Sequence, residues 1–510
     1  MQRPKTTLVL MSLALALALA LSCSVQARYT SKPASVIHSQ TQSDLSVSPN
    51  GHFLVTRDGK PFFWLGDTAW ELIHGTTLEE ASYYLHTRQH QGFTVIQTVV
   101  LAEADGLHRP TPEGLTPFLG DDPTKPNPDY FDKVEAIVAE ADKLGLYVAL
   151  VPSWGDKMTA PWGDGPRIFT TGNLPAARSY GHYLAARLRS HHNVIWLLGG
   201  DRPAHVAGMH NSYLEAMAAK AGFAPDVDWT PIWAAIAEGI HAGSDNKPLI
   251  VFHPQGGPDS TSVQLPNAPW LDVNGMQSGH GGGHDVPVWS WVERDFAVMP
   301  AKPTIDLEVN YEDHPYDPWP RWDPSTGYFN DYDVRKQTYR SVFAGGAGVT
   351  YGHHSVWGFV GSRNDVINHA TMDWMSALQR PGGRQMQYLK DLILSRPSLN
   401  RTEDLTLISS GQGQEGRDHL EAMRDEAASY AFIYFPENDH TTRIDLSRLK
   451  AKTIKAWWYD PRTGIGSLIG TYEGGTLQDF RSPPNGPDWV LVVEDASKNY
   501  APPGLERFED

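Results

Sequence analysis

One pattern recurs along residues 51–398: a short apolar run ends in polar or glycine-rich residues, and a helical segment often follows it. Eight such runs occur, at residues 61–65, 93–101, 146–151, 194–198, 248–252, 271–276, 303–307 and 348–351. Apolar runs of this length are typical of strands that are buried on both faces of a parallel sheet. The pattern therefore predicts eight buried strands.

Helical stretches separate several of these runs. Residues 76–79, Thr-Thr-Leu-Glu, have the form of a capping box that opens a helix reaching about His90. Residues 129–144 carry apolar residues at helical spacing, with Gly145 placed to end the helix. This alternation predicts an α/β fold, a (β/α)8 TIM barrel with long loops. An open doubly wound sheet is the alternative, although no glycine-rich nucleotide-binding sequence follows the first run.

From residue 399 onward the pattern changes to short strands separated by turns. Residues 430–435, 453–459 and 489–493 are rich in β-forming residues, and Asp-Pro-Arg-Thr-Gly at residues 460–464 is a strong turn signal. No long helix is evident there. We therefore expect the barrel to span residues 51–398 and a small all-β sandwich to span residues 399–510.

Residues 1–27 have the features of a signal peptide. Arg3 and Lys5 precede an uncharged run, and Val-Gln-Ala at residues 25–27 supplies the small residues that a signal peptidase reads. Residues 28–50, rich in Ser, Thr and Gln, then form a lead-in linker. We expect export to the periplasm or the medium. Two alternatives remain, a lipid-modified Cys23 or a membrane anchor, but no second segment is apolar enough to span a membrane.

Charge and cysteine content narrow the function classes. The 510 residues include 42 basic and 59 acidic ones, and the formal net charge of −17 argues against nucleic-acid binding, which depends on basic patches. The one cysteine excludes disulfide frameworks and thiolate metal sites. Aromatic residues are numerous, with 17 Trp, 20 Tyr and 17 Phe, which by itself indicates sugar binding only weakly.

Two acidic residues occupy informative strand ends. Asp201 follows the fourth apolar run and Glu308 the seventh, and in this barrel class the loops after the strands build the active site. Glycosidic cleavage needs one protonated carboxyl and one ionised carboxylate. Strands four and seven face each other across part of the barrel mouth, so a sugar could lie between these acids. Each acid also has a structural interpretation, as an ion pair with Arg202 or with His314.

Other polar and aromatic residues at strand ends are candidates for substrate binding. They are Asp67, Trp70, Trp154, Asp156, Lys157, Arg202, His253, Gln277, His280, Tyr311, Tyr351, His353 and His354. Trp and Tyr faces stack on sugar rings, whereas Asp, His and Gln hydrogen-bond hydroxyl groups. Single aromatic residues in a barrel are more often core, so the clustering at strand ends is the stronger indication.

A metal site is the main chemical alternative, because His280 and His284 lie close together, as do His353 and His354. Neighbouring residues in a strand point to opposite faces, and the segment around His280 is too glycine-rich for a helical His-x-x-x-His site. We therefore expect no metal and no cofactor. The Gly-x-Ser-x-Gly, P-loop and HExxH motifs are also absent from the sequence.

Seven ordered segments resemble a known family. They are residues 63–70 (FWLGDTAW), 92–97 (GFTVIQ), 154–157 (WGDK), 199–202 (GGDR), 277–280 (QSGH), 311–315 (YEDHP) and 351–355 (YGHHS). Together they resemble the apiosidase-like glycoside hydrolases, which join a (β/α)8 catalytic domain to a C-terminal β-sandwich. The segment at residues 456–464 is similar to part of that second domain.

The resemblance implies hydrolysis of a glycosidic bond to the branched pentose apiose, as in side chains of the plant pectic polysaccharide rhamnogalacturonan II. It supports Asp201 as acid/base and Glu308 as nucleophile, because both fall in matching segments, and a retaining mechanism is expected. An endo-β-glycanase acting on another polysaccharide is one alternative. A catalytically silent carbohydrate-binding protein is another.

Overall fold

The computed structural model describes residues 44–510 apart from 104, 160–165, 208–215, 217–218, 221, 225, 317–320, 362, 414–415, 506–507 and 509–510. The expected signal peptide, Cys23 and the lead-in before residue 44 lie outside the described residues. The described residues belong to one compact unit. Within the described part, no helix is long and apolar enough to cross a membrane.

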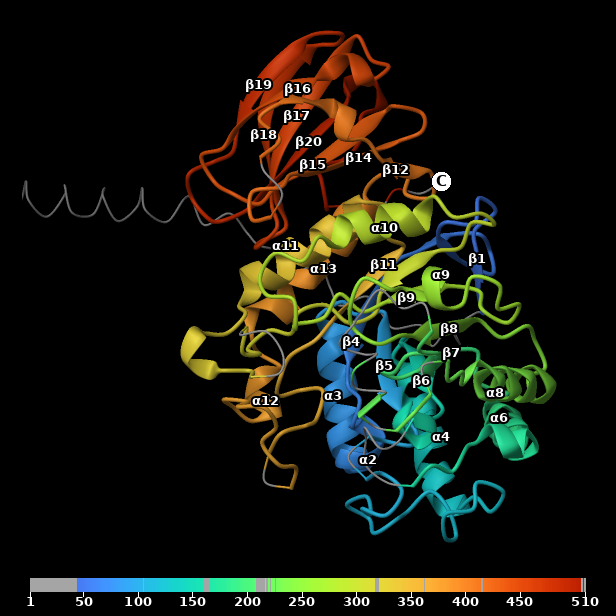
Figure 1. Ribbon diagram of the computed structural model, residues 1–510. Helices are drawn as coiled ribbons and strands as arrows, with labels where there is room; N and C mark the ends of the chain where they lie inside the picture. Colours follow the sequence, from blue (N-terminus) through green and yellow to red (C-terminus); the bar gives the residue numbers. More distant parts are fainter. Residues whose placement is uncertain are drawn as a thin grey trace, which may run out of the picture. The chain divides into compact units, whose positions relative to one another are not determined.

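Eight parallel strands form a nearly closed barrel, which confirms the predicted fold class (Figure 1). They are β4 (Trp64–Thr68), β5 (Val95–Val99), β6 (Tyr147–Val151), β7 (Val194–Gly199), β8 (Ile250–His253), β9 (Asn274–Met276), β10 (Thr304–Asp306) and β11 (Gly348–Tyr351). The strand order is β8-β7-β6-β5-β4-β11-β10-β9, and a parallel bridge between Val251 and Val273 links its two ends. Each strand overlaps one of the eight apolar runs, because both of its faces are buried.

A small antiparallel sheet precedes the barrel. It consists of β1 (Leu45–Val47), β2 (Leu54–Thr56) and β3 (Pro61–Phe62). Leu45 and Leu54 belong to the same apolar cluster as Val95 and Tyr147, the first residues of β5 and β6. The sequence places residues 45–47 in the lead-in linker, but they form a strand because β2 pairs with them. This sheet therefore covers the end of the barrel at which its strands begin.

The helices lie between and after the barrel strands. They are α2 (Leu72–Gly75), α3 (Leu78–His90), α4 (Pro128–Lys143), α5 (Asp156–Thr159), α6 (Leu174–Leu188), α8 (Thr230–Gly243), α9 (Thr261–Gln264), α10 (Val288–Phe296), α11 (Asp331–Phe343), α12 (Trp374–Ala377) and α13 (Pro381–Leu394). Short 3-10 helices are η1 (Thr171–Asn173), η2 (Pro324–Thr326), η3 (Leu405–Leu407), η4 (Leu446–Arg448) and η5 (Ala496–Lys498). Figure 1 shows α3, α4, α6 and α8 on the outside of the strands.

The capping box of α3 begins one residue later than the sequence suggests. Thr77 caps the helix and exchanges hydrogen bonds with Glu80, whereas the sequence pattern pointed to Thr76 and Glu79. The Thr76 hydroxyl instead donates to the Leu72 carbonyl in the preceding turn. Both threonines therefore satisfy backbone groups at this junction, which explains why the sequence alone does not separate them.

The C-terminal region is antiparallel, as predicted. Its larger sheet contains β12 (Arg401–Glu403), β14 (Glu421–Asp425), β15 (Tyr430–Phe435), β20 (Trp489–Asp495), β17 (Thr453–Asp460) and β18 (Ile465–Glu473), in that order. The smaller sheet contains β13 (Ile408–Ser410), β16 (Thr441–Asp445) and β19 (Leu477–Arg481). An apolar cluster drawn from both sheets fills the space between them. This is the layered core of a β-sandwich.

Strand β15 is buried on both faces. Ile433 and Phe435 belong to the core of the sandwich, whereas Phe432 and Tyr434 belong to a second apolar cluster that includes Tyr339 of α11. The rings of Tyr339 and Tyr434 stack with centroids 5.2 Å apart. Because side chains of a strand alternate between two faces, one face of the large sheet builds the sandwich and the other packs against the barrel helices.

Ion pairs reinforce this interface. Arg335 of α11 donates from Nε and Nη2 to the two oxygens of Asp488, at 2.9 and 2.8 Å. Arg396, just after α13, donates from Nε and Nη2 to Glu494 Oε2 at 2.9 and 2.6 Å, and Trp457 Nε1 donates to Glu494 Oε1 at 2.9 Å. These groups are buried. Each carboxylate is thus matched by a planar guanidinium, the geometry that tolerates burial best.

Candidate active site

The turn after β7 presents Asp201. The residues Gly199, Gly200 and Asp201 have positive φ angles of 94°, 104° and 47°. A side chain at Gly199 would meet the His253 carbonyl oxygen at 2.1 Å, and one at Gly200 would meet the Trp154 ring at 2.7 Å. Glycine alone fits such angles in so little space. The two glycines therefore lead the chain between β8 and Trp154, and this path fixes the place of Asp201.

The Asp201 carboxyl is held from two sides. Its Oδ1 accepts a hydrogen bond from Gln255 Nε2 at 3.0 Å, and its Oδ2 accepts one from Arg202 Nη1 at 3.2 Å. About 30% of the side chain is exposed, so a ligand can reach the carboxyl. Burial raises the pKa of Asp201 to about 7; the negative charges of Glu308 and Glu103 add to this effect, whereas Arg202 opposes it. Asp201 is therefore suited to hold a proton near neutral pH.

Glu308 lies two residues beyond the end of β10. Its Oε2 is 3.2 Å from His253 Nε2, and its Oε1 is 3.8 Å from His280 Nε2. Burial acts to raise the pKa of Glu308, but the hydrogen bond and charge of His253, together with His280 and Tyr311, outweigh it, and the pKa lies below its usual value. Glu308 is therefore ionised under conditions in which Asp201 is still protonated.

His253 connects the two acids. The Asp201 backbone N–H points to His253 Nδ1 at 3.4 Å, and the opposite ring nitrogen faces Glu308. One imidazole therefore positions both carboxyl-bearing segments. Two carboxyls with separated acidities at one barrel mouth can protonate a leaving oxygen and attack or activate a nucleophile.

Aromatic and polar groups surround the acids. The rings of Trp70 and Trp154 lie 5.1 Å apart, and Trp70 stands edge-on to His253 at 5.3 Å. His280 lies 4.6 Å from the Tyr311 ring. Trp154 Nε1, Gln277 Oε1 and His280 Nδ1 are buried and make no hydrogen bond within the described part of the chain. Unpaired buried polar atoms are costly, at about 1–3 kcal/mol each, and hydroxyl groups of a sugar are suitable partners for them.

The structure thus brings together many of the predicted site residues. Those grouped around Asp201 and Glu308 are Trp70, Trp154, Arg202, His253, Gln277, His280 and Tyr311. His354 is linked to this group indirectly, because the His314 ring contacts both the His280 ring and the His354 ring. His314 and His354 have ring centroids 4.2 Å apart. Burial lowers the pKa of His354 to about 3, so this histidine is neutral at physiological pH.

Other predicted residues are engaged in fully buried networks instead. Asp67 Oδ2 accepts hydrogen bonds from Arg88 and Tyr84. The Tyr351 hydroxyl donates to Glu312 at 2.6 Å. These contacts join strands of the barrel to α3 and to the loop after β10. Their side chains have no exposed surface, so they would influence a substrate through their neighbours.

Three further predicted residues share this character. His353 Nε2 lies 3.1 Å from Asp313 Oδ2. Lys157 Nζ lies 2.8 Å from Asp156 Oδ2, and neither side chain has exposed surface. Burial raises the pKa of Asp156 to about 7, although Lys157 opposes the rise.

Four residues of the site were not singled out as site residues from the sequence. Glu103 accepts a hydrogen bond from Arg202 at 2.8 Å, Gln255 donates to Asp201, and His314 and Trp322 have ring centroids 4.6 Å apart beside His280. Glu103 and Gln255 follow the second and fifth apolar runs, so their position was visible in the pattern. Their partners come from other strands and were not visible.

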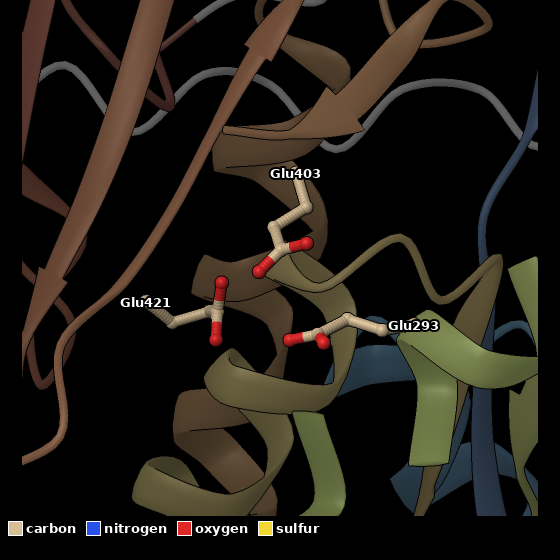
Figure 2. A group of neighbouring side chains, drawn as sticks. All are labelled: Glu293, Glu403 and Glu421. Atoms are coloured by element: carbon tan, nitrogen blue, oxygen red, sulfur yellow. The ribbon is translucent and has the colours of Figure 1, made fainter. Parts of the chain in front are cut away.

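The histidines that suggested a metal site do not gather into one. Among the described residues, the one group of three possible ligand side chains within 4.8 Å of one another consists of Glu293, Glu403 and Glu421. Figure 2 shows their carboxyl groups pointing toward each other from α10 and from the sandwich. Burial, followed by the charge of Glu421, raises the pKa of Glu403 to about 9, and burial raises the pKa of Glu421 well above its usual value. Glu403 and Glu421 therefore retain protons near neutral pH.

Residues 48–400, which include β2 and the whole barrel, match the family described as apiosidase-like, catalytic domain. The chain belongs to the apiosidase-like family. Residues 403–494 match a second family, described as "Putative collagen-binding domain of a collagenase". This second match coincides with the sandwich, so the apiosidase-like barrel and its C-terminal domain meet between residues 400 and 403.

Two solved structures are similar to nearly the whole chain of this apiosidase-like protein. One, described as a glycoside hydrolase, is 31% identical, with a TM-score of 0.76 over 90% of this chain and 98% of that one. The other, a glycoside hydrolase family 5 protein from Bacteroides vulgatus, is 29% identical, with a TM-score of 0.76 over 92% and 96% of the two chains. A third, a putative glycoside hydrolase from Bacteroides vulgatus, shares the fold at 15% identity and a TM-score of 0.62. No curated protein matches the chain.

Proposed function

We propose that this protein, a glycoside hydrolase of the apiosidase-like family, cleaves apiosyl linkages in pectic side chains of the rhamnogalacturonan II type. The family match over residues 48–400 supports the reaction class. The resemblance of seven strand-end segments supports apiose as the sugar. The observation that carries the proposal is the pair Asp201 and Glu308, two acids of separated pKa on either side of one imidazole.

In the proposed reaction, Glu308 attacks the anomeric carbon while Asp201 donates its proton to the leaving oxygen. The glycosidic C–O bond breaks as the bond to Glu308 Oε forms, and the leaving alcohol departs neutral. Asp201, now ionised, removes a proton from water, which attacks the anomeric carbon and releases Glu308. Asp201 ends protonated and Glu308 ends ionised, so the site is restored. The product keeps the anomeric configuration of the substrate.

A screen of the purified protein against defined pectic side-chain oligosaccharides tests the substrate. The expected result is release of apiose or apiose-ended fragments, identified by chromatography and mass spectrometry. NMR of the first-formed product decides between retention and inversion. Release of other sugars from internal linkages would favour an endo-β-glycanase, and calorimetric binding with no new reducing ends over days would favour a silent binding protein.

Export of the protein forms part of the proposal, because its substrate is a plant cell-wall polymer. Positive charges before an apolar run and small residues at 25–27 support it. Sequencing the N-terminus of the mature protein after fractionation should find Arg28. Incorporation of labelled fatty acid at Cys23 would indicate the lipoprotein alternative, and a retained N-terminus in the cytosol would contradict export.

A further inference from the structure

Arg202 bridges Asp201 to an acid from another strand, Glu103. Its Nη2 donates to Glu103 Oε1 at 2.8 Å, whereas its Nη1 lies 3.2 Å from Asp201 Oδ2 and 2.7 Å from the Asp201 carbonyl oxygen. The Arg202 side chain is 6% exposed and that of Glu103 is 37% exposed. Glu103 belongs to the segment after β5, and Arg202 to the turn after β7. The Arg202 guanidinium therefore lies closer to the carboxylate of Glu103 than to the carboxyl of Asp201.

We propose that Glu103 is a positioning residue, which holds the Arg202 guanidinium and thereby preserves Asp201 as a proton donor. The inference rests on the proposed function, in which Asp201 is the acid/base. An arginine that pairs fully with a carboxylate stabilises its ionised form. An ionised Asp201 has no proton to give to a leaving oxygen. Because Arg202 contacts both Glu103 and Asp201, it can hold the turn after β7 in place while its positive charge stabilises the ionised form of Asp201 less than a full ion pair would.

The other charged groups around Asp201 do not replace Glu103. Segments after β6 bring Asp156 and Lys157, which pair with each other at 2.8 Å and so offset one another. His253 comes from β8 and Glu308 from beyond β10, and both take part in the proposed reaction or its support. Among the described residues, Glu103 is the second acid, besides Glu308, whose charge raises the pKa of Asp201.

The sign of the effect follows from these charges. Burial, Glu308 and Glu103 raise the pKa of Asp201, and Arg202 lowers it. Glu103→Gln removes a negative charge that acts directly and also frees Arg202 to approach Asp201, so both consequences lower the pKa. Arg202→Gln removes the main opposing charge and acts in the other direction.

The first test follows the Asp201 carboxyl itself, without any substrate. Infrared difference spectra of the full protein against Asp201→Asn, recorded from about pH 4 to about pH 10, isolate the protonated C=O band. Glu103→Gln should lower its midpoint by about one pH unit, and Arg202→Gln should raise it. Glu113→Gln is the matched control, because Glu113 is 34% exposed and pairs with Lys133 at 2.7 Å outside this network; it should leave the midpoint in place. An unchanged or raised midpoint in Glu103→Gln would overturn the proposal.

The second test follows turnover. In Glu103→Gln the basic limb of the kcat/KM profile should move to lower pH by the same amount, which gives about tenfold less activity above the limb and no loss below it. A substrate with an acidic phenol as leaving group needs no proton from Asp201, so its kcat/KM should show no such limb and should be the same in Glu103→Gln as in the wild type. An equal loss at every pH and with both substrates would show a merely structural role. If the protein cleaves no glycoside at all, the proposed function fails, while the infrared midpoint still decides the effect of Glu103.

Discussion

The barrel mouth and the interface between barrel and sandwich both bury ionisable groups, but they balance charge differently. At the interface, Arg335 and Asp488 form two parallel hydrogen bonds, and neither side chain is more than 1% exposed. At the mouth, His253 contacts the Asp201 backbone N–H and the Glu308 carboxylate, and the pKa values of the two acids move in opposite directions. A matched pair holds one ionisation state and serves stability. An unmatched pair of acids separates the two pKa values, which is the arrangement that the proposed acid/base role of Asp201 requires.

The strongest test of this contrast is Glu308→Gln. We expect kcat/KM to fall by about 10⁴-fold or more, because the carboxylate has no substitute as nucleophile. The free energy of unfolding should fall only modestly, because the lowered pKa of Glu308 means that the folded protein stabilises its ionised form. Steady-state kinetics and thermal unfolding measure both. Glu238→Gln is the control, because Glu238 is 58% exposed and pairs with Arg178 on the surface. Turnover above a tenth of wild type in Glu308→Gln would break the assignment.

The interface should respond in the opposite way. In Asp488→Asn, Arg335 loses the carboxylate that accepts two of its hydrogen bonds and keeps Asp331 as its remaining counter-charge, so we expect a loss of about 1.5–3 kcal/mol in the free energy of unfolding. The folded fraction should keep its kcat/KM. Urea unfolding provides the measurement, and Asp479→Asn provides the control, because Asp479 and Arg443 form an exposed pair whose loss should cost about 0–1 kcal/mol. If Asp488→Asn and Asp479→Asn lost similar free energies of unfolding, the buried ion pair would contribute no more to stability than the exposed one.

The pH dependence sharpens the comparison at the mouth. A pKa of Asp201 raised to about 7 means that the proton donor is present below that pH and lost above it, so kcat/KM should fall as pH rises through about 7. Asp201→Asn should remove this limb and lower kcat/KM by about 10²–10⁴-fold on substrates with poor leaving groups. The measurement is kcat/KM across pH for one substrate with a poor leaving group and one with an acidic phenol as leaving group. A wild-type profile without a basic limb would contradict the acid role.

The smallest expected effect concerns Glu403 at the interface. Its pKa is raised to about 9 in the folded protein, so its contribution to stability is complete at acid pH and is lost as pH rises toward about 9. Glu403→Gln keeps a hydrogen-bonding group without titration and should flatten this decline, with a Tm about 2–4 °C higher than wild type near the alkaline end. Thermal unfolding at several pH values measures it. Glu473→Gln, on strand β18 at the surface, is the control and should leave the decline of Tm with pH unchanged. If Glu403→Gln also left this decline unchanged, the raised pKa of Glu403 would be contradicted.

The fold was predictable in its main lines because strand burial leaves a periodic trace. All eight apolar runs overlap barrel strands, and the candidate acids were recognisable by their place beyond strand ends. The partners of those acids were not. Glu103 and Arg202 lie 99 positions apart in the chain, and nothing in either local sequence indicates that they meet. Asp67 shows the converse, because its strand-end position suggested a ligand contact, whereas Arg88 and Tyr84 occupy its carboxylate.

Sequence alone determined the barrel and the appended sandwich and marked two candidate acids, because these depend on local periodicity and on position beyond strand ends. Tertiary structure decided which acid has the raised pKa, which ion pairs hold the sandwich to the barrel, and which two acids contact Arg202. The physical reason is that a pKa and an ion pair depend on burial and on charges from other strands. Those distances exist only once the chain has folded.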